Sequence, residues 1–109
     1  MKDWLATIKC CFQTDKVLYS RHSRQEMAGE EFGRVVEREV FEAVLGGEVI
    51  EEYPADKPYA SRLIFGLTKQ GRPLHVLCAF APEDGLAVVI TVYQPHPARW
   101  DEWRRRVKS

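Results

Sequence analysis

Long apolar runs, an export signal and the common catalytic motifs are all absent from this sequence of 109 residues. No apolar run approaches the roughly 20 residues that span a bilayer, and the first residues lack the charged-then-apolar pattern of a secretion signal. We therefore expect a cytoplasmic protein with no membrane partner. The sequence also lacks a Walker loop and the GxGxxG, HExxH and GxSxG motifs, so nucleotide-binding, zinc-protease and hydrolase functions have no motif support.

Cysteine is scarce, with Cys10, Cys11 and Cys78 as the three examples. An odd number of cysteines in a chain without an export signal argues against a disulfide framework, so we expect free thiols. Cys10 and Cys11 are adjacent and do not have the CxxC spacing of zinc sites, and a site made from Cys78 and the histidines would require distant residues to converge. We therefore expect no metal and no cofactor.

The composition is typical of one globular domain. The residues are 45% hydrophobic, 29% charged and 11% aromatic, with 16 basic and 16 acidic side chains. Twelve aromatic residues argue against disorder because they supply core-forming side chains. A chain of this length buries roughly two thirds of its extended surface and needs no metal or disulfide to hold a core. We expect a single domain over residues 1–109.

Charge is distributed unevenly along the chain. Between Glu26 and Asp56, ten acidic residues stand against two basic ones, a net charge of −8. From Pro97 onward, five basic residues outweigh two acidic ones. An RNA partner would therefore use one face of the protein only, since the acidic segment repels phosphate. The alternative is that these charge runs are solvated surface.

Apolar residues recur at helical spacing in the first half of the sequence. This pattern predicts one helix over residues 2–13 and a second that follows the N-cap Ser20 and ends at Gly29 or Gly33. A third helix should follow and end at Gly46-Gly47. We expect these helices to pack on a sheet.

After Gly47 the hydrophobic period falls from about 3.6 to 2. Four strands are predicted, over residues 48–53, 62–68, 73–81 and 86–93. Their short links favour an antiparallel meander, because parallel pairing needs a long crossover. The predicted fold class is α+β, with N-terminal helices packed on a twisted four-stranded antiparallel sheet. Residues 98–107 should form a short basic C-terminal helix.

Strand alternation predicts which side chains share a face of this sheet. The helices should meet one row of the 73–81 strand, namely Leu74, Val76, Cys78 and Phe80. The rows that contain Leu63 and Val88 should lie on the same side. The opposite face should be open and should carry Arg62, His75, Thr91 and Tyr93.

Two histidines have neighbours that suit chemistry on a phosphate. His22 lies between Arg21 and Arg24, and it combines an imidazole that titrates near neutrality with two guanidiniums that bind phosphate. The alternative is a helix residue that only bonds a neighbouring carbonyl.

The other histidine, His75, is expected to share the open face with Tyr93 and Arg62. There the histidine and the tyrosine would move protons while the guanidinium stabilises an oxyanion. The alternative is that His75 is simply packed and hydrogen-bonded.

Aromatic side chains occur in two further segments that suit RNA. Residues 52–61 hold Tyr59, a second tyrosine and two prolines, so this stiff segment offers faces for base stacking or serves only to route the chain. Trp100 and Trp103 precede three consecutive basic residues, Arg104, Arg105 and Arg106. This combination suits RNA binding. Alternatively, the tryptophans dock the C-terminal segment and leave the arginines solvated.

Several ordered motifs resemble the domain of unknown function 4258 family. They are Arg21-His22, the segment from Gly47 to Tyr59, Gly71-Arg72-Pro73-Leu74-His75-Val76, the segment from Ile90 to Pro95, and Trp100 with the closing arginines. The similarity covers about residues 16–106. The sequence departs from the family pattern at Val36, where a helix-capping serine is usual.

The resemblance implies a prokaryotic protein related to the RelE/ParE-like toxin superfamily, with a RelE-like fold. Such toxins are often encoded beside a small antitoxin with a YgiT-type zinc finger. RelE-type relatives cleave mRNA with basic and proton-transferring side chains, whereas ParE-type relatives target gyrase.

From the residues and the resemblance together we predict a toxin-like, metal-independent endoribonuclease. The predicted catalytic residues are His22, His75 and Tyr93. The predicted substrate-binding residues are Arg21, Arg24, Tyr59, Arg62, Arg104 and Arg105. The alternative is a non-catalytic module that binds protein or nucleic acid, including a gyrase-directed or degenerate toxin relative.

Overall fold

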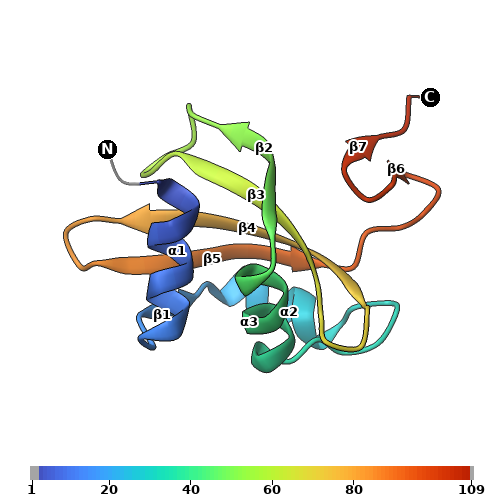
Figure 1. Ribbon diagram of the computed structural model, residues 1–109, viewed down its shortest axis with the longest axis horizontal. Coiled ribbons are helices and arrows are strands. Elements are labelled where there is room, and N and C mark those ends of the chain that lie inside the picture. The colour runs from blue at the N-terminus through green and yellow to red at the C-terminus, as the bar shows by residue number, and fades with distance from the viewer. Residues whose placement is uncertain (1–2, 109) are drawn as a thin grey trace.

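Three helices cover one face of a twisted sheet in the computed structural model, which describes residues 3–108 (Figure 1). The helices are α1 (Trp4–Gln13), α2 (Arg21–Ala28) and α3 (Glu37–Leu45). The sheet contains β1 (Val17–Tyr19), β2 (Glu48–Tyr53), β3 (Ser61–Leu67), β4 (Pro73–Ala81) and β5 (Leu86–Tyr93). A separate two-stranded sheet near the C-terminus pairs β6 (Trp100–Asp101) with β7 (Arg105–Arg106).

Hydrogen bonds between side chains and backbone N–H groups mark the start of each helix. The Asp3 carboxylate accepts a backbone N–H of α1 at 3.2 Å, and the Ser20 hydroxyl accepts that of Ser23 in α2 at 3.0 Å. Val36 has no acceptor in its side chain, but Glu39 reaches back and accepts the Val36 N–H at 3.0 Å. The three predicted helices are therefore confirmed, with starts set by local capping.

The central sheet has five strands, in the order β1-β5-β4-β3-β2. The prediction of a four-stranded antiparallel sheet was therefore wrong. β1 lies parallel to β5, with Val17 opposite Ala87, while the other neighbouring pairs are antiparallel. Short links predict the pairing of strands that are consecutive in the sequence. β1 instead pairs with a strand that comes much later in the chain, and no link length indicates such a pairing. Three residues are also too few to display the period of a strand.

Beyond the end of β1, Glu26 of α2 and Glu30, which follows α2, bond the free edge of β5. Glu26 accepts the N–H of Val92 at 3.1 Å, and Glu30 accepts the N–H of Gln94 at 3.3 Å. These bonds satisfy the exposed edge of β5 beyond the short partner strand. They also hold the end of β5, and with it Tyr93, in a fixed position.

Strand alternation predicted the wrong face of the sheet for each of the two side-chain rows of β3. Ile64 pairs with Val76 and is fully buried beneath the helices, and Gly66 lies against the backbone of Ala43 in α3. Leu63 therefore lies on the opposite face, together with Phe65. Both rows of β3 are apolar, so alternation alone did not distinguish them. The close approach of α3 to a residue without a Cβ decided the orientation.

In β5 a bulge changed the predicted face. The register with β4 shifts at Leu77 and Cys78, so Val89 pairs with Cys78 while Val92 pairs with Val76. Val89 and Val92 are both fully buried against the helices, whereas Val88 is only partly buried. An extra residue in one strand reverses the alternation beyond it. The predicted side of β4 itself is confirmed, because Val76 and Cys78 lie in the core.

The predicted C-terminal helix over residues 98–107 was wrong. β6 and β7 form a hairpin, which we call the C-terminal hairpin (residues 100–106), and it projects at the end of the sheet (Figure 1). Glu102 and Trp103 form its turn with φ of 51° and 64°, and the Arg104 N–H bonds the Asp101 carbonyl at 3.0 Å. A ten-residue helix is marginal without strong packing, and here the packing is made by the hairpin.

The three cysteines are free thiols, and Cys11 and Cys78 are buried while Cys10 is exposed. Burial raises the pKa of the Cys78 thiol. Within residues 3–108, no helix has the length and apolar character needed to cross a bilayer.

Gly66 tests the contact between α3 and β3. A Cβ at this position would lie 1.8 Å from the carbonyl oxygen of Ala43, so the Gly66→Ala variant must push the helix off the sheet. We expect the free energy of unfolding in urea to fall by about 3 kcal/mol. Gly46→Ala is the matched control, because a Cβ there meets nothing within 4 Å. Equal losses in the two variants would contradict this close packing.

Candidate active site beside the C-terminal hairpin

His75 is the centre of the buried polar cluster on the face opposite the helices. Its side chain has 0% exposure. Nε2 lies 2.6 Å from the main-chain carbonyl of Trp103, and Nδ1 lies 3.1 Å from the hydroxyl of Tyr93. Because a carbonyl only accepts, Nε2 carries the proton and Nδ1 accepts the hydroxyl of Tyr93. The imidazole is thus fixed in one tautomer by hydrogen bonds at both nitrogens.

Aromatic rings surround this imidazole. The ring of Trp100 meets it edge-on with centroids 4.3 Å apart, and the rings of Tyr93 and Phe65 lie 5.2 and 6.0 Å away. Burial lowers the pKa of His75 to about 4, although the hydrogen bond to the Trp103 carbonyl raises it in part. His75 is therefore neutral at pH 7.

Tyr93 connects the buried histidine to the surface. Burial raises the pKa of Tyr93 to about 12, so the phenol keeps its proton at neutral pH and donates it to His75. The phenol oxygen retains lone pairs that accept another hydrogen bond. Together the two residues form a neutral pair through which a proton could pass.

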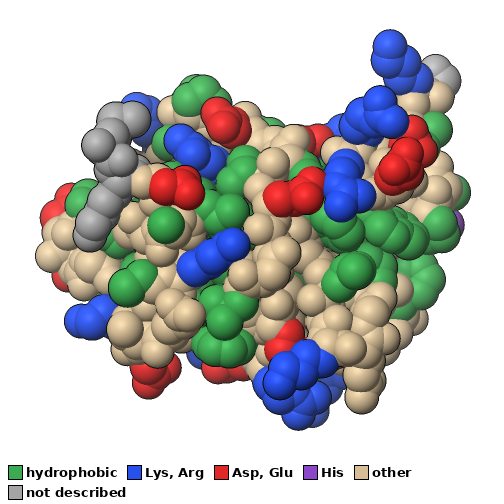
Figure 2. Space-filling model, viewed as in Figure 1, with side chains coloured by type: hydrophobic (Ala, Val, Ile, Leu, Met, Phe, Trp, Pro, Cys, Tyr) green, Lys and Arg blue, Asp and Glu red, His purple; other side chains and the backbone are tan. Residues whose placement is uncertain are grey.

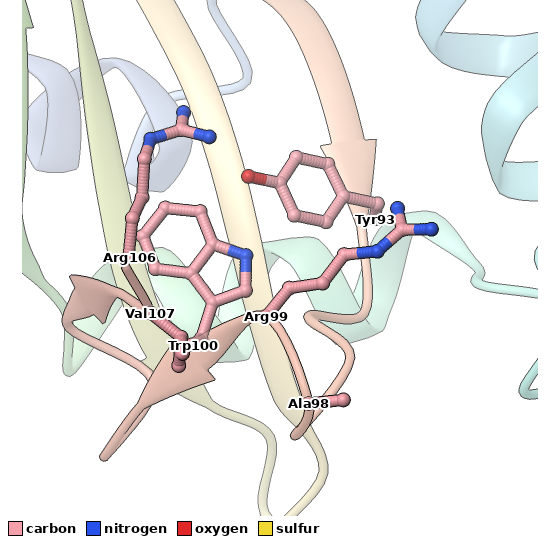
Figure 3. A pocket seen from close by; sticks show the side chains of 6 residues that line it. All are labelled: Tyr93, Ala98, Arg99, Trp100, Arg106 and Val107. Carbon is pink, nitrogen blue, oxygen red and sulfur yellow. The ribbon is translucent and has the colours of Figure 1, made fainter. Parts of the chain in front are cut away.

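A cleft of about 580 Å³ opens next to this pair. It is lined by Tyr93, Ala98, Arg99, Trp100, Arg106 and Val107, and we call it the cleft (Figure 3). Figure 3 shows the Tyr93 hydroxyl directed between Arg106 and the indole of Trp100, with Arg99 on the other side of the phenol ring. Two guanidiniums beside a neutral proton-transfer pair suit an anionic ligand such as a phosphate.

Arg106 is held in the cleft by contacts on three sides. Its guanidinium bonds Glu51 at 2.9 and 3.0 Å and lies 4.7 Å from the ring centre of Trp100. It also donates to the hydroxyl of Tyr53 at 3.4 Å. Although burial opposes the shift, the bonds from Arg106 and Tyr53 hold the pKa of Glu51 below its ordinary value.

Arg104 makes the second attachment of the C-terminal hairpin to the sheet. It bonds Glu48 of β2 at 2.6 Å and lies 4.8 Å from the ring centre of Phe65 in β3. The predicted open face is therefore not open at His75, because the hairpin covers it. The sequence pattern missed this cover because it assigned the same residues to a helix.

The structure does not bring His22 to this cluster. His22 lies on α2 with a side chain 64% exposed, and it contacts Glu26 at 3.3 Å. Arg21 and Arg24 line a different, shallow hollow beside Tyr19. Arg24 is also engaged there, since it pairs with Glu37 at 2.9 Å.

Two other predicted substrate-binding residues lie elsewhere. Arg62 pairs in register with Cys78 and stacks on the ring of Trp4 at 5.1 Å, so it belongs to the helix-covered face and not to the face of His75. The hydroxyl of Tyr59 donates to Glu83 at 2.7 Å in the loops at the far end of β4. Neither residue lines the cleft.

Arg99 and Glu51 are site residues that the sequence did not point to, and Arg106 was noted only as part of the basic run 104–106, not among the predicted substrate-binding residues. The predicted residue Arg105 points elsewhere, because it pairs with Asp101 at 3.2 Å and lines a neighbouring hollow. The pattern that could have identified Arg106 is the alternation of side chains along a hairpin. It places Arg104 and Arg106 toward the central sheet, where they pair with Glu48 and Glu51. A helical interpretation of the segment concealed it.

Fold and site together define an α+β protein with a basic cleft where a C-terminal hairpin meets the sheet. Residues 19–94 match the family described as Domain of unknown function (DUF4258), and the chain belongs to this family. The match includes His75 and Tyr93 but ends before the C-terminal hairpin. Searches of curated proteins and of solved structures found no match.

The burial of a neutral His75 makes stability depend on pH. Its folded pKa of about 4 lies below the ordinary value of 6.5, so the unfolded chain takes up a proton first as the pH falls. The contribution of neutral His75 to the free energy of unfolding is therefore fully present above pH 6.5, and it is lost as the pH falls toward 4. Between pH 7 and 5 we expect this residue to lower the free energy of unfolding by about 2 kcal/mol.

The measurement is urea unfolding of the parent protein and of His75→Gln at both pH values. Titration of the carboxylates is common to both proteins, so the difference between them isolates the histidine. An identical pH dependence in the two proteins would contradict a neutral, buried His75.

Proposed function

We propose that the protein is the toxin-like component of a prokaryotic toxin–antitoxin pair and that it cleaves mRNA without a metal. In this proposal residues 1–109 form one RelE-like toxin-type domain that acts in the cytoplasm. The observation that carries it is the 3.1 Å contact between Tyr93 and His75 at the wall of the cleft that holds Arg99 and Arg106. The relation to RelE/ParE-like toxins that the family resemblance implies supports the choice of RNA as the anionic substrate.

The proposed reaction starts from a ribose 2′-hydroxyl bound next to Tyr93. Its proton passes to the phenol oxygen while the phenol proton passes to Nδ1 of His75. The 2′-oxygen bonds to the adjacent phosphorus, and the bond between phosphorus and the 5′-oxygen breaks. Water protonates the departing 5′-oxygen, and His75 later returns its proton to solvent through Tyr93. The products are a 2′,3′-cyclic phosphate and a 5′-hydroxyl.

The charges of the site favour this proton transfer once a phosphate is bound. The imidazolium that forms on His75 keeps its Nε2–H bond to the Trp103 carbonyl, which stabilises the added charge. Arg99 and Arg106 stabilise the negative charge that develops on the phosphate. The charge of a bound phosphate would offset that of Arg106, which lowers the pKa of His75.

A second candidate function is a non-catalytic module that binds RNA or protein, including a gyrase-directed or degenerate toxin relative. The observation that favours it is the complete burial of His75 with both nitrogens hydrogen-bonded. In that case the cleft would hold a phosphate between its arginines and leave it intact. Cleavage of RNA by the purified protein separates the two functions.

The partner we propose is a small antitoxin with a YgiT-type zinc finger, encoded beside this protein. This proposal follows from the family resemblance. Expression in a bacterial host should arrest growth, and coexpression of the neighbouring small protein should restore it. Growth arrest with intact RNA would favour gyrase-directed action, and harmless expression would contradict a toxin.

Tyr93→Phe is the sharpest test of cleavage, because it removes a single oxygen. We expect the rate of RNA cleavage to fall by about 100-fold or more, since general acid–base groups contribute at least that much. Tyr19→Phe is the matched control, because Tyr19 lies on the helix side of the sheet, packed against the core. Thermal melting of each variant checks that it is folded.

His22→Gln distinguishes the two histidines in the same assay. It should leave the rate within about twofold, because an exposed residue on the surface of α2 lies outside the cleft. A large loss in His22→Gln with none in Tyr93→Phe would overturn the assignment to Tyr93 and His75.

The pH dependence of cleavage gives an independent test. Since His75 is neutral above about pH 4 and Tyr93 keeps its proton to about pH 12, kcat/KM should stay level from pH 8 to pH 5. A decline centred near pH 6.5 would indicate a solvent-exposed histidine instead.

A further inference from the structure

A second basic hollow adjoins the cleft on the C-terminal hairpin. It has a volume of about 450 Å³ and is lined by Pro97, Trp100, Asp101, Arg105, Arg106, Val107 and Lys108; we call it the second hollow. Arg106 and Trp100 line both the cleft and the second hollow. Figure 2 shows Lys and Arg side chains at the end of the molecule where Figure 1 places the C-terminal hairpin.

Positive charge accumulates here in a protein whose net charge is zero. Among residues 3–108, Arg99 in the cleft and Lys108 in the second hollow form no ion pair. Asp101 is the one carboxylate that lines the second hollow, and it pairs with Arg105 at 3.2 Å. Glu102 lies 3.9 Å from the same guanidinium, and Arg106 pairs with Glu51 at 2.9 Å. Arg99 and Lys108, one in each hollow, therefore attract a ligand with more than one negative charge.

The aromatic residue between the two hollows is not free to stack on a base. Trp100 is only 6% exposed, with the guanidinium of Arg106 over its ring and the imidazole of His75 against it. Base stacking needs an exposed aromatic face. A nucleic acid that reaches the second hollow therefore cannot stack a base on Trp100 and is held there through its phosphates.

We infer that the second hollow is a phosphate subsite that binds the phosphate next to the one in the cleft. The inference rests on the proposed function and names its substrate class. Because Arg106 lines both hollows, the two phosphates belong to neighbouring positions of one strand. The substrate is single-stranded RNA with at least two consecutive phosphates, bound with little dependence on base sequence.

The test compares 2′-O-methyl oligonucleotides, which lack the hydroxyl needed for cleavage. A uridine dinucleotide has one phosphodiester and a trinucleotide has two. For the parent protein at low salt, we expect the trinucleotide to bind about tenfold more tightly by calorimetry. In the double variant Arg105→Gln with Lys108→Gln, this advantage should fall below about threefold, while the dinucleotide affinity stays within about twofold.

Two controls sharpen the comparison. Lys57→Gln with Lys69→Gln removes the same amount of charge from exposed positions outside both hollows, and it should preserve the trinucleotide advantage. Replacing uridine by adenosine should change the trinucleotide affinity by about threefold at most, since no base is stacked.

The outcomes separate this inference from the proposed function. If the parent protein binds both oligonucleotides equally, or if the double variant keeps the trinucleotide advantage, the second subsite is overturned while RNA binding in the cleft stands. If neither oligonucleotide binds and RNA is not cleaved, the proposed function falls, and the subsite falls with it.

Discussion

The imidazole of His75 joins the central sheet to the C-terminal hairpin through a hydrogen bond at each ring nitrogen. One bond reaches Tyr93 on the neighbouring strand, and the other reaches the main chain of Trp103 in the hairpin turn. A buried polar group without these partners would cost several kcal/mol in free energy, roughly 1–3 per lost bond. The position of the hairpin is therefore coupled to the tautomer of one side chain. Because the hairpin also carries Arg106 and Trp100, the shape of the cleft depends on the same pair of bonds.

The acidic segment between Glu26 and Asp56 helps to hold the C-terminal hairpin on the sheet. Glu48 and Glu51 belong to this segment, and they bind the guanidiniums of Arg104 and Arg106. The opposite charges that the sequence separates by more than fifty positions are thus brought together on β2 and the hairpin. Exposed ion pairs contribute little individually, but here they act beside cation–π contacts and the bonds of His75. Arg99 has no such partner among the described residues, which leaves it available for an anionic ligand.

Local patterns predicted the parts of the structure that local interactions determine. Capping and helical spacing located α1, α2 and α3, and the period of two located the four long strands within a residue. Long-range packing decided the rest. The orientation of β3 depends on Gly66 against α3, and the addition of β1 depends on a strand that comes late in the chain. The pairing of His75 with Tyr93 was predictable from adjacent strands, whereas its cover was not, because turn residues with positive φ are rare outside glycine.

The parallel pairing of β1 with β5 has a consequence for how the molecule is assembled. Val17 meets Ala87, which lies 70 positions later in the chain. Contacts of such large sequence separation form late, since the intervening segment must first be brought to its place. On a ribosome, the N-terminal strand therefore waits for the last long strand to be synthesised, and the hairpin that completes the cleft emerges later still. The cleft is therefore complete only after β5 has paired with β1 and the C-terminal hairpin has docked on the sheet.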